Sequence, residues 1–403
     1  MRKPKYSLHK KSGQARVIVH GKHVYLGKYN SPESIAGYER ICAELEAKAP
    51  EFSDITLARL CILFMKHAEV YYRKPDGTPT NEASNFRSSL RHIVRECPSL
   101  PVRQFGPLKL KQVRDTMIEA GLARKTINAW VRRIRHMIKW AVSQELATSS
   151  VLESLRTLEP LKAGRTEARE TFGKSAVDVK RIEAIRPLLT RPVRALVDFM
   201  LHTGCRPSEA VSMRWSEIDT AADVWTYRPS DHKTKHKGKG RVIQIGPRAQ
   251  QVLNAVRELS RTDFVFDPQT GVDEIAQQQR GSQAKGQAVG ECYSAQSVRN
   301  AVLVACEKAF NCPLELRTSA LRQRNEGETA RQHQARKDQA KVWRKHNCWS
   351  PGQLRHTKAT EVRKVSDLET AQQILGHSSK TTTERFYAEM DSSRAQENAL
   401  KFG

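Results

Sequence analysis

The sequence predicts a mainly α-helical, multidomain protein with small β-sheets, and three observations lead to that class. The 403 residues are enough for two or three domains, each able to bury a core. Residues 54 to about 160 repeat apolar side chains at helical spacing, with breaks that contain Pro or Gly. Residues 178–403 alternate helix and strand signals, which is typical of a mixed α+β unit.

Charge is the strongest feature of the composition. There are 69 Lys and Arg against 43 Asp and Glu, a formal net charge of +26. Such an excess indicates a polyanionic partner, nucleic acid first and a membrane surface second. No apolar run is long enough to span a membrane, and the start of the chain does not have the pattern of a secretion signal. The eight Cys occur singly, which favours reduced thiols in a cytoplasmic protein over a disulfide frame or a zinc site.

Residues 1–50 form the first expected unit. The first thirty residues hold eight Lys or Arg and no acid. Tyr6–His9, Ala15–Val19 and His23–Leu26 have the pattern of short strands, and the capping run Asn30-Ser31-Pro32-Glu33 predicts a helix that ends near Pro50. We therefore expect a small basic β-rich unit; the alternative is a solvated basic tail.

The second expected unit is helical and covers residues 54–162. Its clearest helix spans Lys125–Ser143, where an apolar stripe (Ile127, Trp130, Val131, Ile134, Ile138 and Ala141) marks the buried face. The remaining faces are basic, so this helix is a candidate for contact with phosphates rather than an ordinary surface helix. The candidate DNA-binding residues are Arg124, Lys125, Arg132, Arg133, Arg135 and Lys139. A linker-like stretch follows, and we place a domain boundary near residues 160–178.

The third expected unit covers residues 178–403, with a polar insertion around 270–345. Val224–Tyr227 and Arg241–Ile245 have the pattern of a β-hairpin, joined by a very basic connection at 232–240. Arg317–Lys345 is rich in Arg, Gln and Lys, typical either of a helix that lies on DNA or of a solvated helix.

Three short motifs stand out in this third unit. They are Thr203–Glu209 (TGCRPSE), Leu354–Thr360 (LRHTKAT) and Leu375–His377 (LGH), the last followed after ten residues by Tyr387. Together and in this order they resemble the tyrosine recombinase (phage integrase) family, whose pattern is T-G-x-R-x-x-E, L-R-H-T-x-A-T, and L-G-H before a Tyr. The first unit then resembles an arm-type DNA-binding module, the second a core-binding domain of SAM-like type, and the third the catalytic domain.

The resemblance implies a site-specific DNA recombinase that integrates a mobile element, forms a 3′-phosphotyrosyl intermediate, and needs no metal, ATP or other cofactor. Arg206 and Arg355 are the implied phosphate clamp, since a planar guanidinium donates two parallel hydrogen bonds to phosphate oxygens. Tyr387 is the implied nucleophile and His377 its assistant. The general acid is a hairpin lysine, for which we choose Lys233. Glu209 and His356 are supporting residues, and Lys235, Lys237 and Lys239 are candidates for DNA contact.

One position departs from the family pattern. The family commonly has a His or Lys three residues before its second arginine, where this chain has Gly352. The departure is compatible with a slower enzyme, with a histidine supplied from elsewhere (His346 is one), or with an inactive one. We expect an active enzyme, because the other motif residues are present.

The resemblance also implies partners. We expect double-stranded DNA, a homotetramer on two duplexes, no membrane, and a place with the nucleoid in the cytoplasm. Two alternatives stay open: a DNA-binding protein that kept the fold and lost cleavage, and a strand transferase of the type IB topoisomerase kind, which acts as a monomer.

Overall fold

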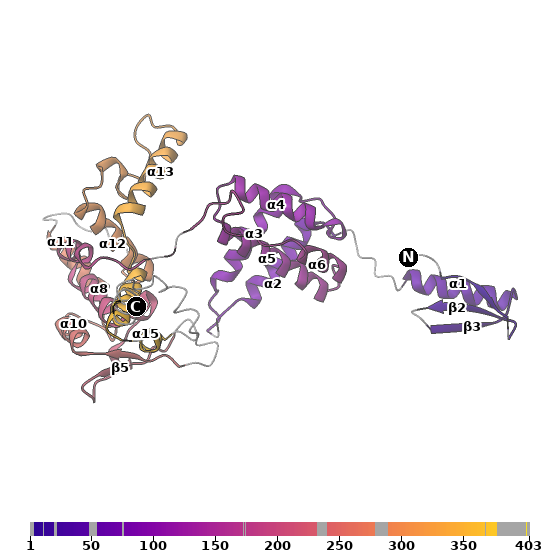
Figure 1. Ribbon diagram of the computed structural model, residues 1–403, viewed down its shortest axis with the longest axis horizontal. Helices are drawn as coiled ribbons and strands as arrows, with labels where there is room; N and C mark the ends of the chain where they lie inside the picture. The colour runs from indigo at the N-terminus through magenta and orange to yellow at the C-terminus, as the bar shows by residue number, and fades with distance from the viewer. Residues whose placement is uncertain are drawn as a thin grey trace. The chain divides into compact units, whose positions relative to one another are not determined.

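The structure is a computed structural model, and it describes residues 4–10, 12–19, 22–47, 55–74, 76–171, 173, 175–231, 240–278, 289–366, 368–376 and 400. The chain divides into two compact units, Met1–Phe172 and Gly173–Gly403, and each is described by itself (Figure 1). The expected class, mainly helical with small sheets, is confirmed.

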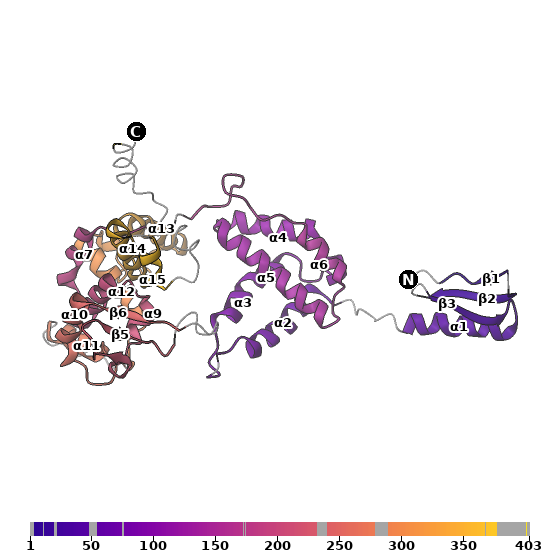
Figure 2. The ribbon, with the colours of Figure 1, turned by 60° about the horizontal axis from the view of Figure 1, so that its bottom comes forward.

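The chain starts with a three-stranded antiparallel sheet and a helix. The strands β1 (Ser7–His9), β2 (Gln14–Val19) and β3 (Lys22–Lys28) lie in the order β1-β2-β3. The helix α1 (Pro32–Ala47) packs against the sheet (Figure 2). Alternation along β2 puts Ala15 and Val17 on the buried face, because successive side chains of a strand point to opposite sides. The strands and the helix start predicted from the sequence are confirmed.

A bundle of helices follows in the same unit, with one 3-10 turn between the second and third. Thr56 and Thr80 cap the first two helices by accepting hydrogen bonds from the backbone of their first turns. The elements are α2 (Leu57–Tyr71), α3 (Asn81–Glu96), η1 (Val102–Gln104), α4 (Pro107–Glu119), α5 (Arg124–Ser143) and α6 (Ser149–Arg156).

Helix α5 is the centre of this bundle. Its stripe Ile127, Val131, Ile134, Ile138 and Ala141 is buried as the spacing predicts, and Met137 joins it. Trp130 lies at the edge of the stripe and packs against His92, with ring centroids 5.1 Å apart. The sequence did not indicate α6, a helix of only two turns.

The second unit combines helices with a small antiparallel sheet, against which α8 and α10 pack. The strands β4 (Ile218–Asp219), β5 (Trp225–Tyr227) and β6 (Ile243–Ile245) lie in the order β4-β5-β6, so the predicted hairpin is confirmed. The helices are α7 (Val179–Ile185), α8 (Arg191–Thr203), α9 (Pro207–Val211), α10 (Pro247–Arg257), α11 (Pro268–Gln278), α12 (Ala295–Ala309), α13 (Ala330–Asn347), α14 (Leu354–Val365) and α15 (Leu368–Leu375). Short 3-10 turns are η2 (Arg186–Leu188), η3 (Trp215–Glu217), η5 (Leu314–Leu316) and η6 (Pro351–Gln353).

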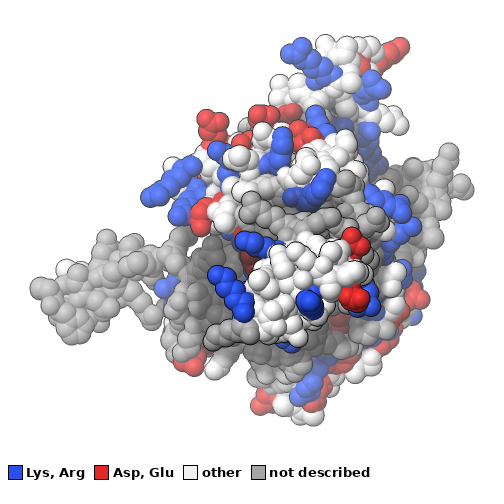
Figure 3. All heavy atoms as spheres, turned by 90° about the vertical axis from the view of Figure 1, so that its right-hand side faces the viewer, with Lys and Arg blue, Asp and Glu red and all other residues white. Residues whose placement is uncertain are grey.

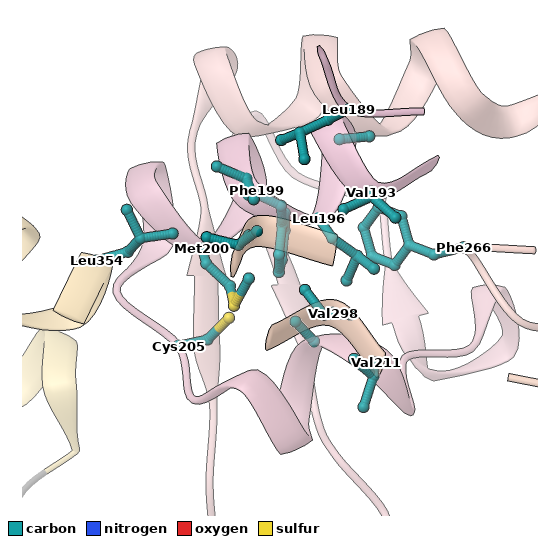
Figure 4. Close-up of a cluster of buried hydrophobic side chains, with 14 of the residues drawn as sticks. Leu189, Val193, Leu196, Phe199, Met200, Cys205, Val211, Phe266, Val298 and Leu354 are labelled. Carbon is teal, nitrogen blue, oxygen red and sulfur yellow. The ribbon is translucent and has the colours of Figure 1, made fainter. Parts of the chain in front are cut away.

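Helix α8 runs through the core of this unit. Leu196, Phe199 and Met200 are fully buried, and α10 and α14 pack against the helix. Figure 4 shows these side chains meeting Val298 of α12 and Leu354, the first residue of α14. The core therefore fixes the positions of the C-terminal end of α8 and of the first turn of α14.

The segment expected as a polar insertion contains parts that pack in two different cores. Helix α12 belongs to the main core, because Val298, Val302 and Cys306 are fully buried. The part after α12 is polar, and it packs around a small core of its own made of Cys312, Leu316, Leu321 and Ala340. Within the expected helical stretch 317–345, α13 begins only at Ala330.

Helix α13 is attached through a buried ion pair. The Glu307 side chain is 3% exposed and lies 2.9 Å from an Nη of Arg344, which is 25% exposed. The same carboxylate accepts hydrogen bonds from the backbone N–H and the hydroxyl of Thr318. These bonds tie α12, α13 and the loop between them together.

The eight cysteines are all free thiols, five of them buried, in agreement with their single spacing. Among the described residues, no three His, Cys, Asp or Glu side chains are grouped closely enough to hold a metal ion. Within the same residues, we find no helix with both the length and the apolar content needed to cross a membrane.

Arg344→Ala should loosen α13 by about 2 kcal/mol, because it leaves a buried carboxylate with fewer partners. We expect roughly 30-fold faster hydrogen exchange of the α13 amides. The matched control is Lys341→Ala one turn earlier, whose 2.7 Å pair with Asp338 is exposed on both sides and contributes little. Equal exchange in the two variants would contradict the anchoring role of the buried pair.

Candidate active site

The three sequence motifs meet through the side chain of Arg355. One Nη of Arg355 donates to the carbonyl of Gly204 over 2.9 Å, and the other donates to the carbonyl of Leu375. Arg355 is only 8% exposed, and its neighbour Leu354 is anchored in the core (Figure 4). A single guanidinium thus joins motifs that are 151 and 20 residues away from it along the chain.

The first motif turns sharply at Gly204. This glycine ends α8 in the left-handed region, with φ of 65°, and its N–H donates to the carbonyl of Met200. A Cβ at this position would lie 3.1 Å from Leu375 Cδ2 and 3.2 Å from Lys358 Cγ. Conformation and space therefore both favour glycine at the point where the other two motifs approach.

Glu209 holds Arg206 by two bonds. Arg206 precedes the first turn of α9; its backbone N–H donates to Glu209 Oε2 over 2.8 Å, and its Nη1 donates to Oε1 over 2.6 Å. The side chain of Glu209 is 1% exposed, whereas that of Arg206 is 21% exposed. The carboxylate is thus inside the protein and the arginine reaches the surface of the site.

A third arginine, Arg241, lies against the same carboxylate. Its Nε is 3.7 Å from Glu209 Oε1, its side chain is 4% exposed, and its Nη1 donates to the carbonyl of Ile374 over 3.4 Å. Arg241 was not among the site residues predicted from the sequence. The alternation Arg241, Ile243, Ile245 (buried) against Val242 and Gln244 (exposed) is the signal that could have found it.

Glu209 stays ionised although it is buried. Burial alone raises the pKa of this carboxyl, but the charges of Arg241 and Arg206 and the hydrogen bonds from Arg206 outweigh it, so the pKa is lowered from its ordinary value. Three guanidinium groups with one carboxylate leave a net positive site. Such a site suits an anion with several oxygens, for which a phosphodiester is the natural candidate.

Two other motif residues lie near Arg355 in the chain. His356 follows it in α14 and is half-buried. Gly352 is in η6, and its neighbour Gln353 is used locally, since its amide accepts from Ser350 N–H and donates to the carbonyl of Ser175. Gln353 therefore does not replace the missing His or Lys. His346 is exposed near the end of α13.

Six of the residues predicted for the site are outside the described part of the chain. They are Lys233, Lys235, Lys237, Lys239, His377 and Tyr387. Their roles remain predictions. Gly376 is the last described residue before His377. The described residues that flank the four lysines are Asp231 and Gly240.

The cations predicted on α5 fall into two groups. Arg124 binds Glu170 and the carbonyl of Leu161, Arg133 binds Glu82, and Arg135 donates to the carbonyl of Leu158. These three arginines stabilise the fold. The exposed group is Lys125, Arg132 and Lys139, which form no ion pair or side-chain hydrogen bond within the described chain. Figure 3 shows one face of the molecule, where exposed Lys and Arg stand among Asp and Glu.

The fold and the arginine site fit the class of the tyrosine recombinases. Residues 178–394, more than half of the chain, match the model of the phage integrase family. The chain belongs to this family. No curated protein sequence matches it significantly.

Three solved structures that are similar to this chain are integrases. A Tn1549 transposon integrase in complex with transposon right-end DNA has a TM-score of 0.58 and 16% identity, covering 86% of this chain and 99% of that one. A lambda integrase dimer bound to a COC′ core site has a TM-score of 0.56 and 15% identity, covering 96% and 95%. A lambda integrase tetramer bound to a Holliday junction has a TM-score of 0.53 and 15% identity, covering 95% of each chain.

Glu209→Gln should destabilise the second unit at neutral pH and much less in acid. Because the pKa of Glu209 is lowered on folding, its contribution is present above about pH 4.5 and is lost as the pH falls through the lowered value. Urea unfolding at pH 7, 5, 4 and 3 measures the difference between wild type and variant, which should shrink only below about pH 4.5. A difference that stays constant or grows as the pH falls would contradict this assignment.

Proposed function

We propose that this protein is a site-specific DNA recombinase that cleaves and rejoins DNA through a 3′-phosphotyrosyl intermediate, for integration or excision of a mobile element. The observation that carries the proposal is the convergence of three motifs on Arg355. The two carbonyls that accept from Arg355 belong to Gly204 and Leu375, which precede Arg206 and His377 by two residues each in the chain. Membership of the phage integrase family supports it.

In this proposal the arginines bind the scissile phosphate. Arg206 and Arg355 donate to its non-bridging oxygens, whose charge increases in the transition state. Glu209 keeps Arg206 in one orientation, so that little reorganisation is needed when the phosphate enters. Arg355 is restrained in the same way by two backbone carbonyls. Binding that is preorganised for the transition state lowers the barrier to reaction.

The chemical step exchanges one phosphodiester for another. The phenolic oxygen of Tyr387 attacks phosphorus, the bond to the 5′-oxygen breaks, and Lys233 gives that oxygen a proton. A phenol has an ordinary pKa of about 10, so His377 assists its deprotonation. The new phosphotyrosyl bond retains the energy of the broken one, and a 5′-hydroxyl of the partner strand reverses the step without ATP.

DNA is the proposed partner, and four copies on two duplexes the proposed assembly. The net charge of +26 and the exposed cations of α5 support DNA binding. The neighbouring structures include a lambda integrase tetramer on a Holliday junction, which supports a tetramer here. We propose that residues 1–50 bind arm-type DNA, 54–162 bind the core site, and 178–403 carry out catalysis, with the protein associated with the nucleoid.

One specific observation favours an alternative function. Gly352 provides no side chain where the family commonly has a His or Lys, so a DNA-binding protein without cleavage is the second candidate. The two functions differ only in whether a covalent adduct forms.

Tyr387→Phe separates them. With a nicked duplex whose cleaved end diffuses away, the wild type should accumulate a covalent adduct at Tyr387, located by peptide mass. The variant should bind the same DNA with equal affinity and form no adduct. The matched control is Tyr293→Phe, a tyrosine of the same unit that should still cleave. If the wild type binds tightly and never forms an adduct, the second candidate holds.

The α5 interface is tested by salt dependence. Replacing Lys125, Arg132 and Lys139 by Ala should reduce the slope of log affinity against log salt by about 0.9 for each phosphate that is no longer neutralised. The control removes three exposed cations of α2 and α3, Lys66, Arg91 and Arg95. Equal slopes for the two triple variants would show that only overall charge matters and that α5 is not the interface.

A further inference from the structure

Arg241 is buried, and burial is energetically unfavourable for a charged group. Its side chain is 4% exposed, and its Nε and one Nη are buried with no hydrogen-bond partner among the residues that the structure describes. The burial lowers the pKa of the guanidinium against the opposing effect of Glu209. Replacing a whole buried ion pair with apolar residues of similar size is often neutral or stabilising, so fold stability alone does not require the Arg241–Glu209 pair at this position.

On one side, Arg241 shares Glu209 with Arg206. Oε1 of Glu209 accepts the 2.6 Å bond from Arg206 Nη1 and lies 3.7 Å from Arg241 Nε. Two cations thus act on one carboxylate from different elements, the first motif and the chain leading into β6. The position of Glu209, and through it that of Arg206, depends on both.

On the other side, Arg241 touches the end of α15. Its Nη1 donates to the carbonyl of Ile374 over 3.4 Å. A Cβ at Gly376 would lie 2.3 Å from the same Nη1, and Gly376 has a φ of 60°. The guanidinium therefore lies directly against the backbone of the residue that precedes His377 in the chain.

We propose that Arg241 is a positioning residue for strand transfer, which sets Glu209 with Arg206 on one side and the Gly376 turn before His377 on the other. It also comes directly after the very basic connection 232–240 in the chain, so it joins the hairpin to both parts of the site. The inference rests on the proposed function, because it concerns the rate of phosphotyrosyl formation.

The geometry predicts different effects on rate and on binding. Because Arg241 is buried, Arg241→Met should bind the nicked duplex as wild type does. Its single-turnover rate of covalent adduct formation should fall about 100-fold, the cost expected from a displacement of about 1 Å among reacting groups. Arg241→Lys keeps the charge but has one donor group for two separated contacts, and should fall in between. Val242→Thr, the exposed next residue, is the control and should cleave at the wild-type rate.

A double-mutant cycle separates positioning from general loosening. Gly376→Ala puts a methyl group where Arg241 Nη1 lies, so it should slow adduct formation in the wild-type background. In the Arg241→Met background the same change meets no guanidinium, and the added loss should be much smaller. Such non-additivity is expected of residues in contact. Melting curves of each variant show that the unit is folded, and Arg241→Lys serves if Arg241→Met does not fold.

The outcomes distinguish this inference from the proposed function. No adduct with the wild type overturns the proposed function itself. A wild-type adduct with Arg241→Met within about threefold of the wild-type rate overturns the positioning role. A parallel loss of DNA affinity and rate, or strictly additive effects in the cycle, overturns it as well. A rate loss at unchanged affinity, with strong non-additivity, supports it.

Discussion

The carboxylate of Glu209 is the constraint on which the arrangement of the site depends. A buried ionised carboxylate is unfavourable unless it is paired and hydrogen-bonded, and here two arginines and a backbone N–H meet that need. The pairing holds the arginines as firmly as it holds the acid. One negative charge inside the protein therefore aligns Arg206 at the surface and Arg241 beneath it.

The core of the second unit makes this possible. Helix α8 ends at Gly204, and α14 starts with Leu354 buried beside it, so Arg355 can reach the carbonyl of Gly204 only because both ends are packed in the same core. The α13 segment is attached to that core through Glu307 and Arg344, with a small apolar cluster of its own. It adds polar surface, while the Gly204 and Leu375 carbonyls that accept from Arg355 belong to other segments.

Much of this organisation could be predicted from the sequence, for physical reasons. Apolar periodicity identified α5 and its buried face, and the capping run with Pro32 marked the start of α1. The three motifs indicated which segments meet.

What periodicity does not reveal is the partner of each charge. The sequence alone could not distinguish two groups of candidate DNA-binding residues on α5, which are Arg124, Arg133 and Arg135 on the one hand and Lys125, Arg132 and Lys139 on the other. Only the folded chain brings Glu170, Glu82 and the carbonyl of Leu158 to the first three. Arg241 was missed because a charged residue beside a lysine-rich stretch suggests solvent, although its alternation with Ile243 indicated the interior.

The hydrogen bonds of Arg355 to carbonyl oxygens have a consequence for which nearby residues can be substituted. A carbonyl is supplied by the main chain whatever side chain the residue carries, so residues around the clamp can be exchanged without removing its acceptors. The positions with little freedom are those set by backbone shape, such as Gly204. A site held in this way can accept substitutions around it, provided that the backbone at Gly204 and Leu375 keeps its path.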